Sequence, residues 1–131
     1  MTDRIALRLA ALAGGMAVAL GAFGAHTLKE TLTEHGTIAL WEKAVLYHFV
    51  HALMLFILGT RRPIPRGPWF SFMGGILLFS GSLYALALTQ MRWLGALTPL
   101  GGVGFLLGWV WLILSPEPSS PPGSPGKQSE G

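Results

Sequence analysis

Four long apolar blocks fill most of this 131-residue chain, and they constrain its fold more than any other feature. Each block is close to the ~20 residues that a helix needs to cross about 30 Å of hydrocarbon. Inside a bilayer every backbone polar group must find its partner within the protein, which leaves helices as the structure for isolated blocks of this length. We therefore predict an all-α integral membrane protein with four transmembrane helices, over about residues 5–25, 40–59, 69–89 and 93–114.

The composition agrees with a bilayer environment and excludes several other classes of protein. Hydrophobic residues make up 51% of the chain and charged residues only 11%, whereas soluble domains carry about 25% charged residues. The Lys and Arg residues lie at segment ends without a basic stripe, so we expect the lipid bilayer and no nucleic acid as partner. Because the chain has no cysteine, disulfides, cysteine-ligated zinc and iron–sulfur clusters are excluded.

The segments between the blocks divide the chain into a transmembrane domain over residues 1–114 and a tail. Residues 27–36 are polar and end in Gly36, which is typical of a short interfacial helix with a glycine stop. Residues 61–68 are basic and proline-rich, so we predict a non-helical loop there. Residues 115–131 are rich in Pro, Ser and Gly, which predicts a disordered tail.

The distribution of positive charge predicts the orientation in the membrane. With both termini in the cytoplasm, six basic residues lie inside and three outside. Cytoplasmic loops carry the excess of Lys and Arg, so this orientation is favoured. The inside set is Arg4, Arg8, Arg61, Arg62, Arg66 and Lys127, and the outside set is Lys29, Lys43 and Arg92. A cleaved signal peptide is the alternative interpretation of the first block, since it has a basic start and a small-residue end.

Glycine spacing suggests an internal repeat. Gly14, Gly15 and Gly21 recur 60 residues later as Gly74, Gly75 and Gly81, so the first block corresponds to the third. The two copies would run in the same direction, as two tandem helical hairpins, and cleavage of the first block would leave one hairpin incomplete. Small residues allow helices to approach closely in lipid. We expect helix packing at Gly14, Gly15, Gly21, Gly24, Gly74, Gly75, Gly81, Gly104 and Gly108.

The fourth block also contains a GxxxG motif, formed by Gly104 and Gly108. This motif supports close helix–helix contact in membranes. Tight packing within one chain is the first interpretation. Homodimerisation through the fourth helix is the alternative.

Four motifs, in order along the chain, resemble one known family. They are Gly21-Ala22-Phe23-Gly24-Ala25-His26, Trp41 with Tyr47-His48-Phe49-Val50-His51-Ala52-Leu53, Phe79-Ser80-Gly81-Ser82-Leu83-Tyr84, and Thr98-Pro99-Leu100-Gly101-Gly102-Val103 followed by Gly108-Trp109. Together they resemble the DUF423 family of small integral membrane proteins, over roughly residues 5–114. The resemblance implies a bacterial inner-membrane (plasma-membrane) protein with four spans and an uncleaved first span. It implies no activity and therefore supplies no catalytic residues.

Histidines within the apolar blocks are the candidates for chemistry, because ionisable groups inside a membrane are costly and mark functional sites by default. Tyr47, His48 and His51 share one broad helix face. Whether His26 joins them depends on the start of the second helix. A start near Ala44 would bring the three histidines together near the outer face, and a start at Thr37 would keep His26 apart.

Three functions remain open for this polar cluster of His26, Tyr47, His48 and His51. The first is structural, with neutral side chains hydrogen-bonded between helices, in a protein that is accessory to other membrane proteins. The second is a metal or haem site on His26, His48 and His51, since imidazole suits zinc, copper and haem iron. The third is a small proton-coupled transporter, although all six carboxylates lie at span edges, in loops or in the tail. We expect the first: no enzyme, no catalytic residue and no cofactor.

Overall fold

The computed structural model describes residues 1–116, and every regular element within them is helical. Four of these helices are long and apolar enough to cross a membrane, which confirms the predicted all-α architecture with four transmembrane helices. Their bounds are Asp3–Ala25, Ile38–Thr60, Arg66–Thr89 and Arg92–Leu114. The predicted disordered tail lies outside the described residues from residue 117 onward.

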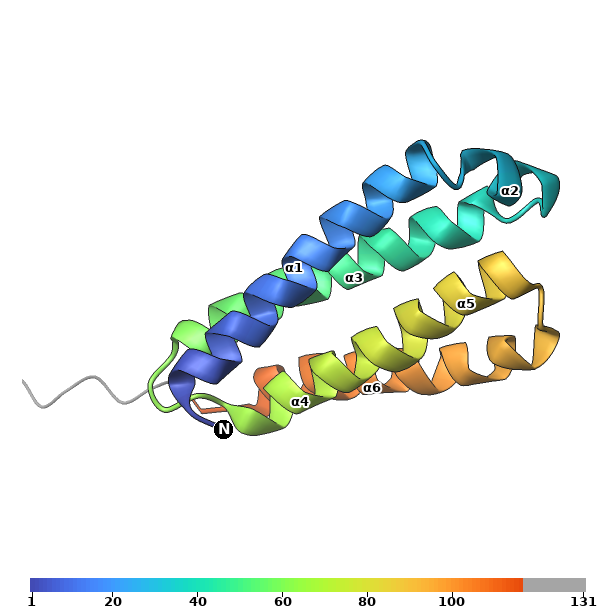
Figure 1. Cartoon of the computed structure of the whole chain (residues 1–131). Helices are drawn as coiled ribbons and strands as arrows, with labels where there is room; N and C mark the ends of the chain where they lie inside the picture. The colour runs from blue at the N-terminus through green and yellow to red at the C-terminus, as the bar shows by residue number, and fades with distance from the viewer. Residues whose placement is uncertain (117–131) are drawn as a thin grey trace, which may run out of the picture.

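The four spans form two antiparallel hairpins that lie side by side (Figure 1). In the first hairpin, α1 (Asp3–Ala25) packs along α3 (Ile38–Thr60). In the second hairpin, the third span packs along α6 (Leu97–Leu114). The third span consists of α4 (Arg66–Gly75), the π-helix η1 (Ile76–Ser80) and α5 (Gly81–Thr89). Because α3 contacts both α1 and the whole third span, it is the central helix of the bundle.

The connections at the end of the bundle opposite the N-terminus, between α1 and α3 and between α5 and α6, each contain one residue with positive φ. After α1 the chain forms the short helix α2 (Lys29–Glu34), as predicted, and Gly36 turns it into α3 with φ at 65°. At the end of α5, Gln90 adopts the left-handed conformation with φ at 56°. The chain then continues through the 3₁₀-helix η2 (Arg92–Ala96) into α6. Both left-handed residues end a helix and reverse the chain, which is where this conformation is expected.

The third span begins earlier than the sequence predicted, because prolines are tolerated in the first turn of a helix. We predicted a non-helical loop through residue 68, but α4 begins at Arg66, so this boundary was wrong. Pro68 is the third residue of α4, where the backbone N–H has no intrahelical acceptor, and its missing donor therefore costs nothing. Pro99 is likewise the third residue of α6.

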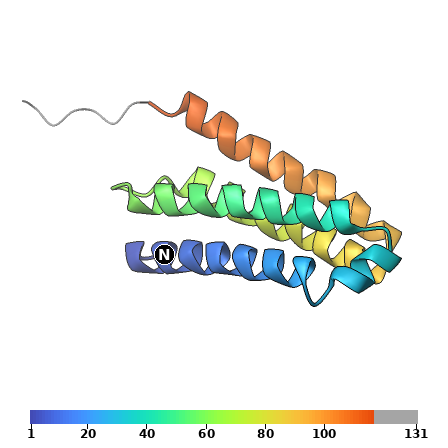
Figure 2. The same ribbon diagram turned by 90° about the horizontal axis from the view of Figure 1, so that it is seen from above.

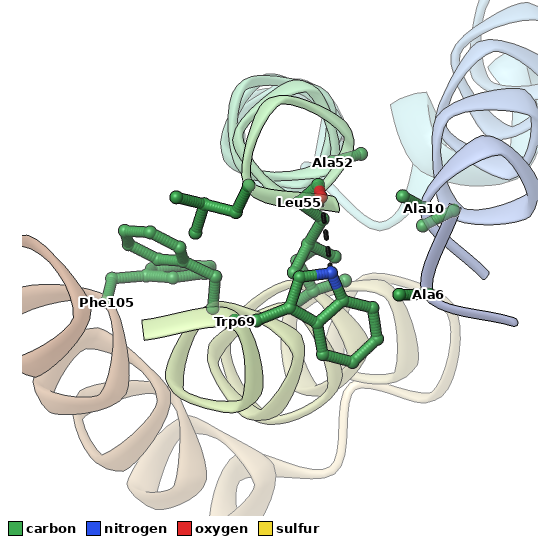
Figure 3. Close-up of a cluster of buried hydrophobic side chains, with 10 residues drawn as sticks. Ala6, Ala10, Ala52, Leu55, Trp69 and Phe105 are labelled. Carbon is green, nitrogen blue, oxygen red and sulfur yellow. Dashed lines mark hydrogen bonds between the residues drawn. The ribbon is translucent and has the colours of Figure 1, made fainter. Parts of the chain in front are cut away.

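The core lies where both hairpins meet, toward the loop between α3 and α4, and Trp69 is its largest member (Figure 3). Trp69 is 1% exposed, and its indole Nε1–H donates to the carbonyl oxygen of Leu55 on α3 over 3.2 Å. Ala6 and Ala10 of α1 lie on one side of this tryptophan, and Phe105 of α6 lies on the other. One side chain from the third span therefore joins the interior faces of both hairpins.

Glycines form close contacts at five of the nine predicted packing positions. A Cβ on Gly24 would collide with the Trp41 ring, one on Gly75 with Phe105, and one on Gly108 with Phe72. Gly104 lies against the Gly75 backbone, where a Cβ would stand 3.4 Å away, and Gly21 faces Val45 at 3.3 Å. The GxxxG motif of α6 is thus occupied by the third span of the same chain, so it does not present a free surface for a second copy.

The other predicted packing glycines do not contact a neighbouring helix in this way. A Cβ on Gly14, Gly15 or Gly74 would have nothing within 4 Å, and one on Gly81 would have only a backbone oxygen of its own span at 4.0 Å. Packing therefore does not explain these members of the 60-residue repeat. Close approaches that the sequence analysis did not predict occur instead at Gly59, Gly67 and Gly101.

The fourth span is the least enclosed part of the bundle. It has the lowest share of buried residues of the four spans, and in Figure 2 α6 diverges from α3 toward its C-terminal end. Its outward side chains include Trp111, which is 54% exposed, and Ile113, which is 78% exposed. Surfaces of this kind suit the lipid environment of a membrane helix.

Candidate functional site

The central helix α3 carries three of the four side chains of the predicted polar cluster. His48 and His51 face the interior of the bundle and are 4% and 5% exposed, whereas Tyr47 is 40% exposed. His48 lies about 15 Å and His51 about 20 Å along α3 from its first residue, at 1.5 Å per residue. Both histidines are therefore well inside the membrane-spanning part of the chain, where a polar side chain needs a partner.

His51 has a partner at each ring nitrogen. Its Nδ1 lies 2.7 Å from the carbonyl oxygen of Tyr47, one turn earlier on the same helix. Its Nε2 accepts from the indole Nε1–H of Trp109 on α6 over 3.2 Å. A carbonyl only accepts and an indole N–H only donates, so the proton must be on Nδ1 and the lone pair on Nε2. The two bonds together specify one neutral tautomer of His51.

Aromatic rings enclose His51 on its remaining sides. Its ring stacks on Phe105 with 3.6 Å between centroids and 10° between planes. Phe72 lies at 5.4 Å, and the Trp109 ring lies at 6.1 Å in an edge-on arrangement. The histidine therefore occupies a position in the aromatic interface between α3, the third span and α6.

His48 pairs with the third span instead of α6. Its Nδ1 lies 3.2 Å from the hydroxyl oxygen of Tyr84 on α5, and either group can be the donor. Both side chains line a groove of about 270 Å³ between α1 and the third span, whose other walls are apolar. One turn away, Ser80 Oγ donates to the carbonyl oxygen of Ala44 on α3 over 2.8 Å. Two neighbouring polar contacts thus join α3 to the third span within the bilayer region.

His26 lies apart from the other two histidines. It follows the last residue of α1 and is exposed. The register of the first hairpin explains the separation: Gly24 lies against Trp41 and Gly21 against Val45, so His26 is level with the beginning of α3. Since α3 begins at Ile38, close to the earlier of the two starts considered, His48 is several turns away. Within residues 1–116 no three His, Cys, Asp or Glu side chains are grouped as a metal site requires.

A fourth histidine, which sequence reasoning did not select, makes a contact outside the spans. His35 lies between α2 and α3, and its Nδ1 is 3.0 Å from the carbonyl oxygen of Ala87. Thr37 Oγ1 donates to the same oxygen over 2.9 Å. Ala87 is in the last turn of α5, where carbonyls have no intrahelical donor, so these side chains cap that helix. Nothing in the sequence indicated the pairing, because it joins residues about 50 positions apart.

Charged side chains lie at the two ends of the bundle. The N-terminal end carries Asp3 and Arg62, whose carboxylate and guanidinium groups are 3.0 Å apart, and both are about half exposed. An exposed ion pair of this kind contributes at most about 1 kcal/mol. It therefore fixes the end of α1 beside the loop after α3 without supplying much stability.

Residues 20–102 match the family described as "Protein of unknown function (DUF423)". The chain belongs to the DUF423 family. This confirms the resemblance found from the four motifs, and the matching region contains all four histidines and the whole of α3.

Relatives of this DUF423 protein are also described as membrane proteins. It is 46% identical over 112 residues to a UPF0382 membrane protein of Staphylococcus aureus (strain bovine RF122 / ET3-1), covering 82% of this chain and 90% of that one. It is 40% identical over 119 residues to the UPF0382 membrane protein YwdK of Bacillus subtilis (strain 168), covering 86% and 95%. No solved structure matches the chain. The protein is thus a small multi-pass membrane protein of a family that has no assigned activity.

Proposed function

We propose that this DUF423 protein is a non-enzymatic component of the bacterial plasma membrane, with a structural role or a role accessory to other membrane proteins. The observation that carries the proposal is the hydrogen bonding of the polar side chains within the spans. His48, His51 and Ser80 each contact another helix of the same chain. Such bonds stabilise helix contacts in membranes by about 0.6 kcal/mol on average. They give the histidines a packing role that requires no ligand.

The geometry of His51 argues against a metal or haem at this residue. A metal-binding imidazole offers one lone pair to the metal and commonly donates its other N–H to a carbonyl. His51 makes the second of these contacts, but its lone pair accepts from Trp109. A metal would have to displace the Trp109 indole. His26, the other residue of the candidate haem pair, lies at the end of α1, so the two cannot face one site without rearrangement of α1 and α3.

The expected result for a purified sample is therefore the absence of a cofactor. An absorption spectrum of the protein in detergent should show no Soret band, and metal analysis should show no stoichiometric metal. A Soret band or bound metal that disappears in His51→Ala but persists in His35→Ala would contradict the proposal. His35 is the matched control because it lies outside the spans and contacts a different helix.

The proposal places both termini in the cytoplasm, on the basis of charge. Among the described residues, Arg4, Arg8, Arg61, Arg62 and Arg66 lie at the end of the bundle that carries the N-terminus. The opposite end carries Lys29, Arg92 and, one turn into α3, Lys43. The positive-inside rule applies to short loops like these.

Single cysteines can test this orientation, because the native chain has none. Thr33 of α2 and Ser115 after α6 are both exposed and lie at opposite ends of the bundle. In intact cells, a membrane-impermeant maleimide should label Thr33→Cys. Ser115→Cys should react only after the membrane is opened. The reverse pattern would show that the termini lie outside.

A further inference from the structure

An apolar groove of about 480 Å³ lies between α1 and α3, in the half of the bundle next to α2. Gly21 and Gly24 form part of its α1 wall, which carries no side chain at these two positions. Trp41 lies against Gly24 and is held there by its Nε1–H, which donates to the carbonyl oxygen of Leu20 over 2.9 Å. The groove is therefore a built feature of the first hairpin, and it is separate from the buried histidines.

The length of the groove corresponds to one leaflet of a bilayer. Along α3 its lining runs from Ile38 to Phe49, which is about 17 Å at 1.5 Å per residue. Half of the hydrocarbon core is about 15 Å thick. α1 and α3 run along the long axis of the bundle, so the groove follows that axis too (Figure 1). A helix of a partner protein would extend across both leaflets, whereas this groove accommodates a chain that ends near the midplane.

One charged side chain lines the groove. Glu42 lies on the second turn of α3, about 6 Å from its beginning, and the rest of the lining is apolar apart from the Trp41 indole. The ion pair recorded within residues 1–116 joins Asp3 to Arg62 at the other end of the bundle, so no cationic side chain of the described chain lies within 4.0 Å of the Glu42 carboxylate. A carboxylate at the edge of the hydrocarbon can pair with a cationic group, and an exposed pair of this kind contributes up to about 1 kcal/mol.

We propose that this groove binds one molecule of an amine-bearing phospholipid, phosphatidylethanolamine. One acyl chain lies along Gly21 and Val45 toward Phe49, and the ammonium group pairs with the Glu42 carboxylate. The apolar lining recognises the chain, and the carboxylate selects a zwitterionic headgroup that bears an ammonium group over an anionic headgroup that has none.

Lipid binding can be measured on the whole protein by native mass spectrometry from detergent. The probes are phosphatidylethanolamine and phosphatidylglycerol with identical acyl chains. The wild-type protein should retain one phosphatidylethanolamine and prefer it about three- to fivefold, the ratio that corresponds to an ion pair of up to about 1 kcal/mol. Glu42→Gln should remove that preference. The control Glu34→Gln should keep it, because Glu34 lies on α2 and does not line the groove.

A second pair of variants tests the position of the acyl chain. Val18 lines the groove but is 61% exposed, so Val18→Trp can fill it without disturbing the core and should abolish lipid retention. Gly14→Leu is the control on the same helix, since nothing lies within 4 Å of a Cβ there, and it should retain lipid. Equal retention of the two lipids by the wild type would overturn the headgroup assignment. Retention by Val18→Trp, or a lipid-free dimer in the wild type, would overturn the groove assignment.

Discussion

At the scale of single residues, His51 shows why an ionisable side chain inside a membrane need not perform chemistry. A neutral imidazole offers one donor and one acceptor in fixed, opposite directions. The fold uses the donor on the carbonyl of Tyr47 and the acceptor on the indole of Trp109. A charged imidazole would place an N–H against the Trp109 N–H, so the arrangement itself requires the neutral form. His51 therefore connects α3 to α6.

A double-mutant cycle can measure this connection. His51→Phe keeps the stack on Phe105 but removes both ring nitrogens, and Trp109→Phe removes the indole donor. We expect a coupling free energy of about 0.6 kcal/mol, and at most about 1.7 kcal/mol, as for other polar contacts between membrane helices. The measurement is unfolding in mixed micelles with increasing SDS, followed by circular dichroism.

The control for this cycle pairs His51→Phe with Trp111→Phe. Trp111 lies on the same helix, is 54% exposed and makes no hydrogen bond to His51. Its coupling to His51 should be close to zero. If the Trp109 cycle gave the same value as this control, the hydrogen bond would make no contribution to stability.

At the scale of helices and connections, the sequence predicted how many transmembrane helices exist. It did not predict which face of each helix contacts its neighbour. The length of the apolar blocks predicted four spans, because the hydrocarbon thickness sets that length whatever the neighbours are. Among the glycines expected at helix contacts, a Cβ on Gly75 or Gly108 would collide with a ring of a neighbouring helix, whereas one on Gly14 would meet nothing within 4 Å. A Cβ on Gly101 would meet the backbone of Phe79, a contact set by how two helices are rotated against each other. That rotation depends on all the side chains between them, so no local pattern encodes it.

For the candidate site too, the sequence predicted the buried residues but not their contacts. The sequence identified His48 and His51 as buried polar residues, since ionisable groups in an apolar block have few alternatives. Their partners Tyr84 and Trp109 lie 36 and 58 residues further along the chain. The position of His26 relative to His48 and His51 depended on the residue at which α3 begins. This start is a boundary between a polar and an apolar segment. Boundaries of this kind are the least certain feature of a sequence pattern.

The π-helix η1 gives a prediction for the third span. A π-helix has i→i+5 hydrogen bonds and is equivalent to one extra residue in an α-helix. Deleting Leu77, which is 66% exposed and lies in η1, should therefore restore a regular α-helix and keep Ser82 and Ala87 facing inward. Deleting Phe70, which is 54% exposed and lies in α4, should rotate one flank of the span by about 100°.

The two deletions can be compared by yield of monodisperse protein and by thermal unfolding in detergent. The Leu77 deletion should remain folded, with at most a modest loss of stability, and the Phe70 deletion should aggregate. If both deletion variants lost folded protein equally, the packing of the third span would require the π-helix η1. The extra residue in η1 could then not be removed without loss of the fold.

At the scale of the whole molecule, the fold is two hairpins joined through α3. The polar contacts between the hairpins all involve α3 or the turn before it. They join Trp69 to Leu55, Ser80 to Ala44, Tyr84 to His48, Trp109 to His51, and Ala87 to His35 and Thr37. They are spread along the full length of the bundle. Because lipid provides no hydrophobic drive between helices, these bonds and close packing must hold the hairpins together.

Separated hairpins should therefore associate. We expect the fragments 1–62 and 63–131, expressed together, to insert and to purify as a complex, since both cut ends lie in the loop before α4. Ser80→Ala should weaken the complex about three- to fivefold, because it removes a buried hydrogen bond to Ala44 that contributes about 0.6–1 kcal/mol. Fluorescence energy transfer between labelled fragments in detergent gives the dissociation constant.

Ser82→Ala is the matched control for this experiment, because it changes a serine of the same span that has a different partner. The Ser82 hydroxyl bonds to Thr98 Oγ1 over 2.7 Å, which is a contact within the second hairpin. This variant should lower the stability of the 63–131 fragment and leave its affinity for the 1–62 fragment nearly unchanged. If both serine variants weakened the complex equally, the effect would come from general loosening of the third span. If neither did, close packing such as Trp69 against α3 would account for the association, and the polar contacts would serve to set the register of the two hairpins.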